Sequence, residues 1–334
     1  MRRLLAGLTA AVLLAPAFAH ANDPGADGLI GRDVRAGVAA NGKVWVSSFG
    51  ALVAIEEATN VRKVEIPNGL IDVVKWKGEV WALRRRADLP APQPSQSRYS
   101  IYVVKAGRLF ELPPLLTGTA DGPQGLAMSA SRPRLLGRTR LWTLDRNASR
   151  WRETKISRPA DPAGGAVMSL AASADGQTIY VGWNAGKDGG RLERIATGPG
   201  AVSTRTTLPV TGLAPDPQHP ACVLAAYGLA QATSSGKVVR VCGDAETTVL
   251  EHKATGASEP FYGIAADGDT VWAATSTTLF RLTPKGQDQF PIGDYVWLSD
   301  LKVTRPAPGA LLVLTDLNRH FSTAGSTPLV IANP

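Results

Sequence analysis

Cysteine and histidine are scarce in this chain, and both shortages restrict its chemistry. The 334 residues include 2 cysteines and 4 histidines. His219, His252 and His320 lie far apart without the spacing of metal ligands, and His20 falls in a leader that we expect to be removed. No Cys-x-x-Cys pair is present, which disfavours a redox role. The sequence therefore predicts no metal site and no cofactor.

Catalytic motifs are missing as well. No serine lies in a nucleophile elbow, and no glycine-rich phosphate loop precedes a helical segment. We therefore predict no catalytic residue.

Beyond its N-terminus the chain has no apolar stretch long enough to cross a membrane. Residues 4–18 are almost wholly apolar, follow a basic segment at 1–3, and end at the Ala-His-Ala sequence of 19–21, which a signal peptidase reads. No cysteine follows for lipid attachment. We expect a cleaved signal peptide, residues 1–21, and a mature domain, residues 22–334, in the periplasm or secreted.

The net charge is positive, +8 for the whole chain and about +6 once the leader is removed. A basic protein outside the cytoplasm meets anionic lipids, envelope polymers and acidic proteins. Nucleic acid is not an expected partner in that compartment.

What the sequence does contain is a repeat. A short apolar phrase recurs around residues 38, 70, 126, 170, 213 and 264, with a weaker copy at 301. Seven to eleven residues later comes a second phrase, often headed by an aromatic residue, whose key positions are Trp45, Trp81, Leu136, Tyr180, Val223, Trp272 and Leu312. These positions lie about 44 residues apart on average, the length of a four-stranded propeller blade.

Two further phrases complete each repeat, and the last often ends in proline, as at Pro67, Pro113 and Pro209. Proline suits an outermost strand, where it removes a backbone donor that would face solvent. A β-helix would need a shorter repeat and a sandwich needs none. We predict an all-β fold, a single β-propeller of seven four-stranded blades, with six or eight blades as alternatives.

The two cysteines, Cys222 and Cys242, fall at the start of a second strand and the end of the third strand that follows it. Antiparallel pairing across the loop at 226–236 places them opposite each other, so we predict a cross-strand disulfide.

The clearest copy of the repeat combines Gly263-Ile264-Ala265, Val271-Trp272 and Leu279-Phe280-Arg281-Leu282. It resembles the repeats of virginiamycin B lyase-like propellers and of two-component-regulator propeller domains. The lyase resemblance implies a histidine with nearby carboxylates at the ends of second strands. Those ends hold no histidine here, so lyase activity is not expected.

Several long loops are expected on one face of the propeller, at 84–97, 114–124, 157–167, 184–190 and 226–236. Long loops on a rigid scaffold often carry function. The candidate ligand- or partner-binding residues near them are basic, aromatic or amide side chains: Arg84, Arg85, Arg86, Gln124, Arg138, Arg140, Trp183, Lys187, Tyr227, Tyr262, Tyr295 and Trp297. Arginine binds carboxylate or phosphate in a planar fork, and aromatic rings provide rigid contact area. The alternative is that the aromatic residues pack between blades and the arginines form a solvated rim.

These features favour a non-enzymatic binding or protein-interaction module. Its partner would be an unidentified acidic protein, an anionic small molecule or an envelope polymer, and a monomer is favoured. The alternative is a propeller lyase or hydrolase with an unrecognised site in the central funnel.

Overall fold

The computed structural model describes residues 34–40, 43–48, 50–56, 62–86, 98–106, 108–115, 122–145, 149–162, 167–229, 235–254, 257–275, 277–291, 298–307, 310–317 and 329–332. The predicted signal peptide, Tyr295, Trp297 and His320 lie outside these segments. The described segments form strands and one short 3-10 helix, η1 (Gly186–Asp188). None of the helical structure found in them is long and apolar enough to cross a membrane.

The described strands form six four-stranded sheets, one three-stranded sheet and a two-stranded ribbon. We number the four-stranded sheets as blades one to six in chain order. Blades one to three contain β1 (Val34–Ala40), β2 (Lys43–Ser48), β3 (Ala51–Glu56) and β4 (Arg62–Ile66); β5 (Leu70–Trp76), β6 (Glu79–Arg85), β7 (Tyr99–Lys105) and β8 (Arg108–Glu111); and β9 (Gly125–Met128), β10 (Pro133–Leu136), β11 (Arg140–Asp145) and β12 (Arg150–Lys155).

Blades four to six contain β13 (Val167–Ala172), β14 (Thr178–Asn184), β15 (Gly190–Ala196) and β16 (Val202–Thr207); β17 (Val210–Pro215), β18 (Val223–Leu229), β19 (Ser235–Cys242) and β20 (Ala245–Leu250); and β23 (Gly263–Asp267), β24 (Thr270–Ala274), β25 (Thr278–Thr283) and β26 (Gly286–Pro291). The three-stranded sheet contains β27 (Leu298–Ala307), β28 (Ala310–Leu317) and β29 (Leu329–Ala332), and the ribbon pairs β21 (Lys253–Ala254) with β22 (Ala257–Ser258).

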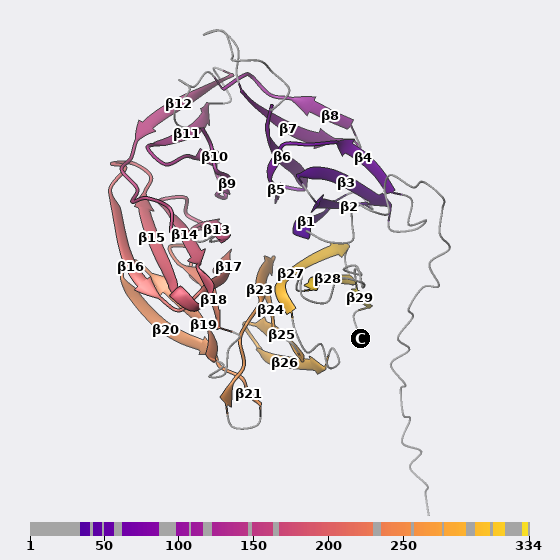
Figure 1. The fold of residues 1–334 in the computed structure, drawn as a ribbon, viewed down its shortest axis with the longest axis vertical. Coiled ribbons are helices and arrows are strands. Elements are labelled where there is room, and N and C mark those ends of the chain that lie inside the picture. Colours follow the sequence, from indigo (N-terminus) through magenta and orange to yellow (C-terminus); the bar gives the residue numbers. More distant parts are fainter. Residues whose placement is uncertain are drawn as a thin grey trace, which may run out of the picture.

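The first strands of the sheets stand side by side around one axis (Figure 1). In chain order these are β1, β5, β9, β13, β17, β23 and β27, and each lies against the next. The last of them, β27, also lies against β1, so the ring of inner strands is closed. The prediction of an all-β propeller with four-stranded blades is confirmed.

The hydrophobic core lies between neighbouring blades. Trp81 and Leu83 of blade two, for example, pack with Leu126, Leu135 and Trp142 of blade three. Because a middle strand is covered on both faces, it buries consecutive residues, as β14 does over five positions in a row. The outermost strand β12 instead has only exposed and half-buried residues.

The aromatic positions that marked the repeat are core residues. Trp45, Trp81, Tyr180 and Trp272 are all buried in the second strands of their blades. The outermost strands β4, β8 and β16 end just before Pro67, Pro113 and Pro209, as the sequence predicts.

The predicted disulfide is confirmed. Cys222 directly precedes β18 and Cys242 ends β19, and their Cα atoms are 4.5 Å apart. The neighbouring pair Val223 and Val241 is in register across the two strands, which places the cysteines opposite each other. The bond therefore fastens the two middle strands of blade five.

Candidate binding face

Each blade is an antiparallel meander, so its second-to-third connection and its exit to the next blade lie at the same end of the sheet. We call this end of the ring the long-loop face. It includes η1 between β14 and β15, the segment 156–162 after β12, and the segment 251–262 that contains the ribbon β21–β22. The opposite face carries the first-to-second and third-to-fourth turns.

A buried ion pair lies at the long-loop face, where blade three meets blade four. Arg158 follows β12 and Glu193 lies on β15, and the Arg158 Nε atom is 2.6 Å from Glu193 Oε2. Both side chains have 0% solvent exposure. A buried charge is tolerated when it is paired and hydrogen-bonded, and here each ion supplies the other's counter-charge.

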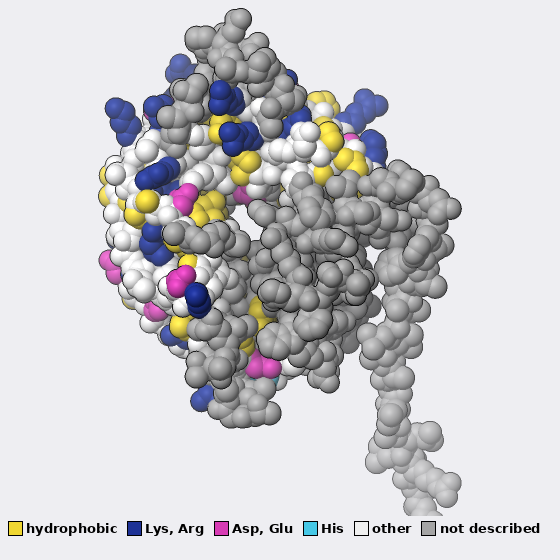
Figure 2. Space-filling model, in the orientation of Figure 1, with side chains coloured by type: hydrophobic (Ala, Val, Ile, Leu, Met, Phe, Trp, Pro, Cys, Tyr) yellow, Lys and Arg dark blue, Asp and Glu magenta, His cyan; other side chains and the backbone are white. Residues whose placement is uncertain are grey.

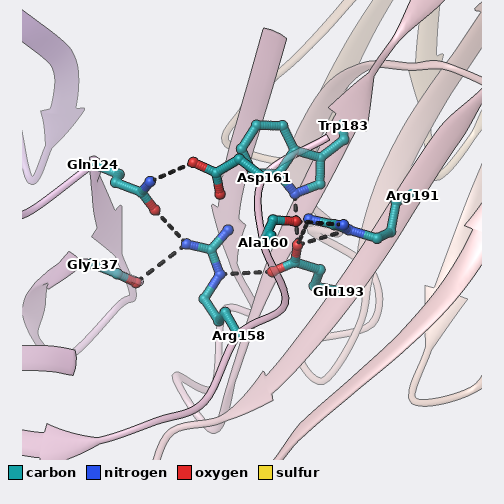
Figure 3. Close-up of polar contacts among 8 residues, drawn as sticks. All are labelled: Gln124, Gly137, Arg158, Ala160, Asp161, Trp183, Arg191 and Glu193. Atoms are coloured by element: carbon teal, nitrogen blue, oxygen red, sulfur yellow. Dashed lines mark hydrogen bonds and ion pairs between the residues drawn. The ribbon is translucent and has the colours of Figure 1, made fainter. Parts of the chain in front are cut away.

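Two further side chains of blade four donate to the same carboxylate (Figure 3). Trp183 Nε1 donates to Glu193 Oε1 at 2.7 Å, and Arg191 donates from Nε at 3.0 Å and from Nη2 at 2.7 Å. The Arg191 guanidinium also lies 5.5 Å from the centre of the Trp183 ring, within cation–π range. The Glu193 carboxylate thus accepts hydrogen bonds from two arginines and an indole and orients all three.

Arg158 also donates hydrogen bonds to residues of its own blade, blade three. Its Nη1 atom donates to Gln124 Oε1 at 2.5 Å and to the Gly137 carbonyl at 3.2 Å. Gln124 in turn donates from Nε2 to Asp161 Oδ2 at 2.9 Å, an exposed contact. The remaining nitrogen of Arg158, Nη2, is buried and has no hydrogen-bond partner within the described segments.

We call these six residues the Arg158 cluster: Gln124, Arg158, Asp161, Trp183, Arg191 and Glu193. Figure 3 shows that the unpaired Nη2 atom points toward the space between Asp161 and the Trp183 ring. The carboxylate of Glu193 already accepts hydrogen bonds from both arginines and the indole, so within the described residues only Arg158 Nη2 remains as an unused buried donor of the cluster.

The structure brings together two of the residues predicted from sequence, Gln124 and Trp183, through the Arg158 cluster. The four other members, Arg158, Asp161, Arg191 and Glu193, were not selected as site residues. The one available signal was Glu193, an acid flanked by Leu192 and followed by Ile195 in a buried third strand.

The three predicted arginines at the end of β6 have different surroundings. Arg84 donates from Nε to the Asn68 carbonyl at 3.0 Å and from Nη2 to Asn68 Oδ1 at 2.9 Å, so it holds the turn that enters β5. Arg85 is exposed and Arg86 is half-buried.

The predicted basic residues of the next two blades lie at the surface. Arg138 and Lys187 are exposed, and Arg140 pairs with Glu153, with 2.9 Å between Nη1 and Oε2. In Figure 2 dark blue side chains gather along the arc of the ring where Figure 1 labels β11, β12 and β15.

The predicted aromatic residues are more deeply placed than a contact surface requires. Tyr227 is 1% exposed and its hydroxyl donates to Glu246 Oε1 at 2.5 Å. Tyr227 therefore offers no surface to a ligand, in contrast to the expectation, because its side of β18 is covered by blade four. Tyr262 is half-buried, and burial, with the Glu259 carboxylate, raises the pKa of its hydroxyl.

Two histidines contact carboxylates, a relationship that the sequence did not reveal. His219 Nδ1 lies 3.5 Å from Asp216 Oδ2, and His252 Nε2 lies 3.8 Å from Glu259 Oε2. The first pair sits in a first-to-second turn and the second at the long-loop face, so they do not form one site. Within the described residues, no three His, Cys, Asp or Glu side chains are grouped as metal ligands would be.

No protein-family model matches the chain, and no curated protein matches it in sequence. Among solved structures, the extracellular domain of a putative hybrid two-component system from B. thetaiotaomicron is similar, with 15% identity and a TM-score of 0.52, over 90% of this chain and 38% of that one. YCF48 bound to D1 peptide is similar with 12% identity and a TM-score of 0.57, over 92% of this chain and 93% of that one.

A chain of the Mitotic Checkpoint Complex is also similar, with 12% identity and a TM-score of 0.54, over 84% of this chain and 86% of that one. This chain thus spans well under half the length of the two-component chain and most of the length of the other two. At such identities the likeness shows the propeller fold, and with it an architecture that solved proteins use in an extracellular domain and in bound complexes.

Proposed function

We propose that this chain is a non-enzymatic binding propeller that works outside the cytoplasm and holds an acidic protein partner on its long-loop face. The observation that carries this proposal is the basic character of blade three, whose long-loop end carries the exposed Arg138 and Lys155. Residues 132–158 contain nine basic and two acidic side chains, a net charge of +7 out of +8 for the whole chain.

The two carboxylates of this segment neutralise only part of its charge. Glu153 pairs with Arg140 at 2.9 Å and Asp145 pairs with Arg152 at 2.5 Å. Arg138 and Lys155 are exposed at the long-loop end of the blade, beside the Arg158 cluster. A surface of one sign attracts partners of the opposite sign and accelerates their association.

An acidic protein segment is the proposed occupant. Arginine forks bind side-chain carboxylates in a bidentate manner, and the exposed Arg138 lies at this end of the blade. The propeller of YCF48 is bound to D1 peptide, and we propose the same class of ligand, a protein segment, for this chain.

The proposed location rests on the disulfide and on the N-terminal sequence. Disulfides persist in oxidising compartments such as the periplasm or the cell exterior. The signal peptide predicted for residues 1–21 leads to the same compartment.

We also propose that the ring has seven blades. In this count the sheet β27–β28–β29 is the last blade and closes the ring against β1. An experimental structure of the mature chain would count the blades directly.

Binding is tested with a fluorescent glutamate-rich peptide, and a glutamine-rich peptide of equal length serves as the uncharged control. We expect the protein to bind only the acidic peptide, and more weakly as salt rises. The double variant Arg138→Glu/Lys155→Glu should weaken binding about tenfold or more because it reverses charge at the long-loop end of blade three.

The matched control is Arg150→Glu/Lys285→Glu, which makes the same change of net charge at the opposite face. Arg150 begins β12 and Lys285 lies in the turn between β25 and β26. Equal loss of binding in the two double variants would mean that net charge alone is responsible, and would overturn the proposed face. Arg84 is left unchanged because it holds Asn68.

A further inference from the structure

Arg134 is a nearly buried cation for which the described segments of the chain hold no acidic partner. It lies on β10 and is 7% exposed. Its Nη1 atom donates to Ser129 Oγ at 3.2 Å, and its buried Nε atom has no hydrogen-bond partner in the described part of the chain. None of the ion pairs found there includes Arg134. A hydroxyl does not neutralise a guanidinium, so the described residues leave this charge uncompensated.

A second positive charge, that of Arg132, lies close to Arg134. Arg132 lies two residues earlier in the same hairpin and is exposed. Burial, and then the charge of Arg132, lower the pKa of Arg134 from its ordinary value, which is the direction expected when no anion is near. The hairpin end thus presents two positive charges that repel each other.

The surroundings of these two arginines are held firmly by three blades. Ser129 Oγ accepts from the Arg132 backbone N–H at 3.2 Å and lies 3.4 Å from Ser131 Oγ. From blade two, Trp76 Nε1 donates to the Ser129 carbonyl at 2.6 Å. The turn of blade four approaches so closely that a Cβ atom on Gly176 would lie 2.8 Å from Ser129 Oγ.

We propose that Arg134, Arg132 and Ser131 form a binding site for a tetrahedral oxyanion of the phosphate class. The site lies at the β9–β10 turn, on the face opposite the long-loop face, and so does not depend on the function proposed above. A doubly charged anion would supply the counter-charge that the described residues do not, and guanidinium and hydroxyl donors match phosphate oxygens.

Titration with inorganic phosphate at constant ionic strength tests the site, with chloride as the reference salt. We expect saturable binding to the wild type, seen as ³¹P line broadening and as a rise in the melting temperature. Arg134→Met should abolish saturable binding. Without phosphate this variant should melt at or above the wild-type temperature, because an uncompensated buried cation has been removed.

Arg132→Ala provides a second variant that keeps the core intact, and it should weaken phosphate binding about tenfold. Arg140→Ala, at the other end of the same blade, should bind phosphate like the wild type. Glycerol 3-phosphate distinguishes a free ion from a phosphate carried on an organic group: tighter binding of the ester than of the inorganic ion identifies the latter.

An equal melting-temperature rise in the wild type, Arg134→Met and Arg132→Ala would mean adventitious ion binding only and would overturn the proposal. Absence of saturable binding to the wild type would do the same. If Arg134→Met does not fold, the comparison of Arg132→Ala with Arg140→Ala decides the question.

Discussion

Arg158 and Glu193 form an ion pair that joins blade three to blade four and has no access to solvent. The Arg158 Nε atom lies 2.6 Å from Glu193 Oε2, and both side chains are 0% exposed. The pair joins the segment after β12 to β15 of the next sheet, and Arg158 also donates to the Gly137 carbonyl of its own blade. Removing Glu193 would leave Arg158 buried without the carboxylate it pairs with, whereas Glu193 would keep its ion pair with Arg191 if Arg158 were removed.

Glu193→Gln should therefore be strongly destabilising. The loss of one partner of a buried pair typically costs about 3–5 kcal/mol of unfolding free energy, because the desolvated partner keeps its charge. Urea unfolding followed by tryptophan fluorescence measures this loss. We expect the double variant Arg158→Met/Glu193→Leu to recover part of it, since neither charge then remains.

Arg140→Ala is the control for that experiment. Arg140 pairs with Glu153 at 2.9 Å, but each side chain is 35% exposed. Solvent screens such pairs, so the loss should stay below about 1 kcal/mol. Similar losses in Glu193→Gln and Arg140→Ala would contradict the central role of the buried pair.

The Cys222–Cys242 disulfide should stabilise blade five measurably. It closes a sequence separation of 20 residues, for which loop-closure entropy gives roughly 3 kcal/mol. Cys222→Ser/Cys242→Ser should lower the urea midpoint accordingly, and dithiothreitol should lower the wild-type midpoint to the same value. The double variant itself should not respond to dithiothreitol, and a response would show that the reductant acts elsewhere.

Comparing Gly69 with Gly78 separates the steric need for a glycine from the need for a positive φ angle. Both have positive φ, 75° and 79°, so alanine is strained at either position by about 1–2 kcal/mol. A Cβ on Gly69 would lie 2.1 Å from the Arg85 carbonyl oxygen, whereas nothing lies within 4 Å of a Cβ on Gly78. Gly69→Ala should therefore destabilise the protein clearly more than Gly78→Ala in urea unfolding. Equal losses would mean that backbone strain alone matters.

The repeat made much of the fold predictable. Trp45, Trp81, Tyr180 and Trp272 recur at one position of the blade, and each is buried in a second strand. The disulfide could also be predicted, because Cys222 and Cys242 are placed symmetrically about the loop at 226–236. Both inferences depend on the position of a residue within its own blade, which sequence spacing determines.

The candidate site was less predictable because it depends on contacts between blades. Arg158 and Glu193 are 35 residues apart, and their meeting requires the rotation of one blade against the next, which no local pattern encodes. Tyr227 illustrates a related difficulty. An aromatic residue near a strand end packs or projects according to the face on which it lies, and a shift of one residue reverses that face.

The buried Tyr227 hydroxyl should make the protein sensitive to alkaline pH. Burial, followed by the hydrogen bond to Glu246, raises the pKa of Tyr227 above its ordinary value of 10.0. Below pH 10 the hydroxyl is protonated in both the folded and unfolded chains, and its contribution to stability is complete. Above pH 10 only the unfolded chain releases the proton, so stability falls by up to about 1.4 kcal/mol per pH unit for this group.

In Tyr227→Phe the unfolding free energy should therefore decline less steeply between about pH 10 and pH 11.5. The slope should be smaller by close to the contribution of one proton, about 1.4 kcal/mol per pH unit. Glu246 keeps its ion pair with Arg205 at 2.7 Å, so the variant does not leave that carboxylate alone. Urea unfolding at each pH gives the slope, and absorbance at about 295 nm follows tyrosine ionisation. Identical slopes in the wild type and Tyr227→Phe would show that the decline comes from other groups, among them Tyr180 and Tyr262, whose pKa values burial also raises.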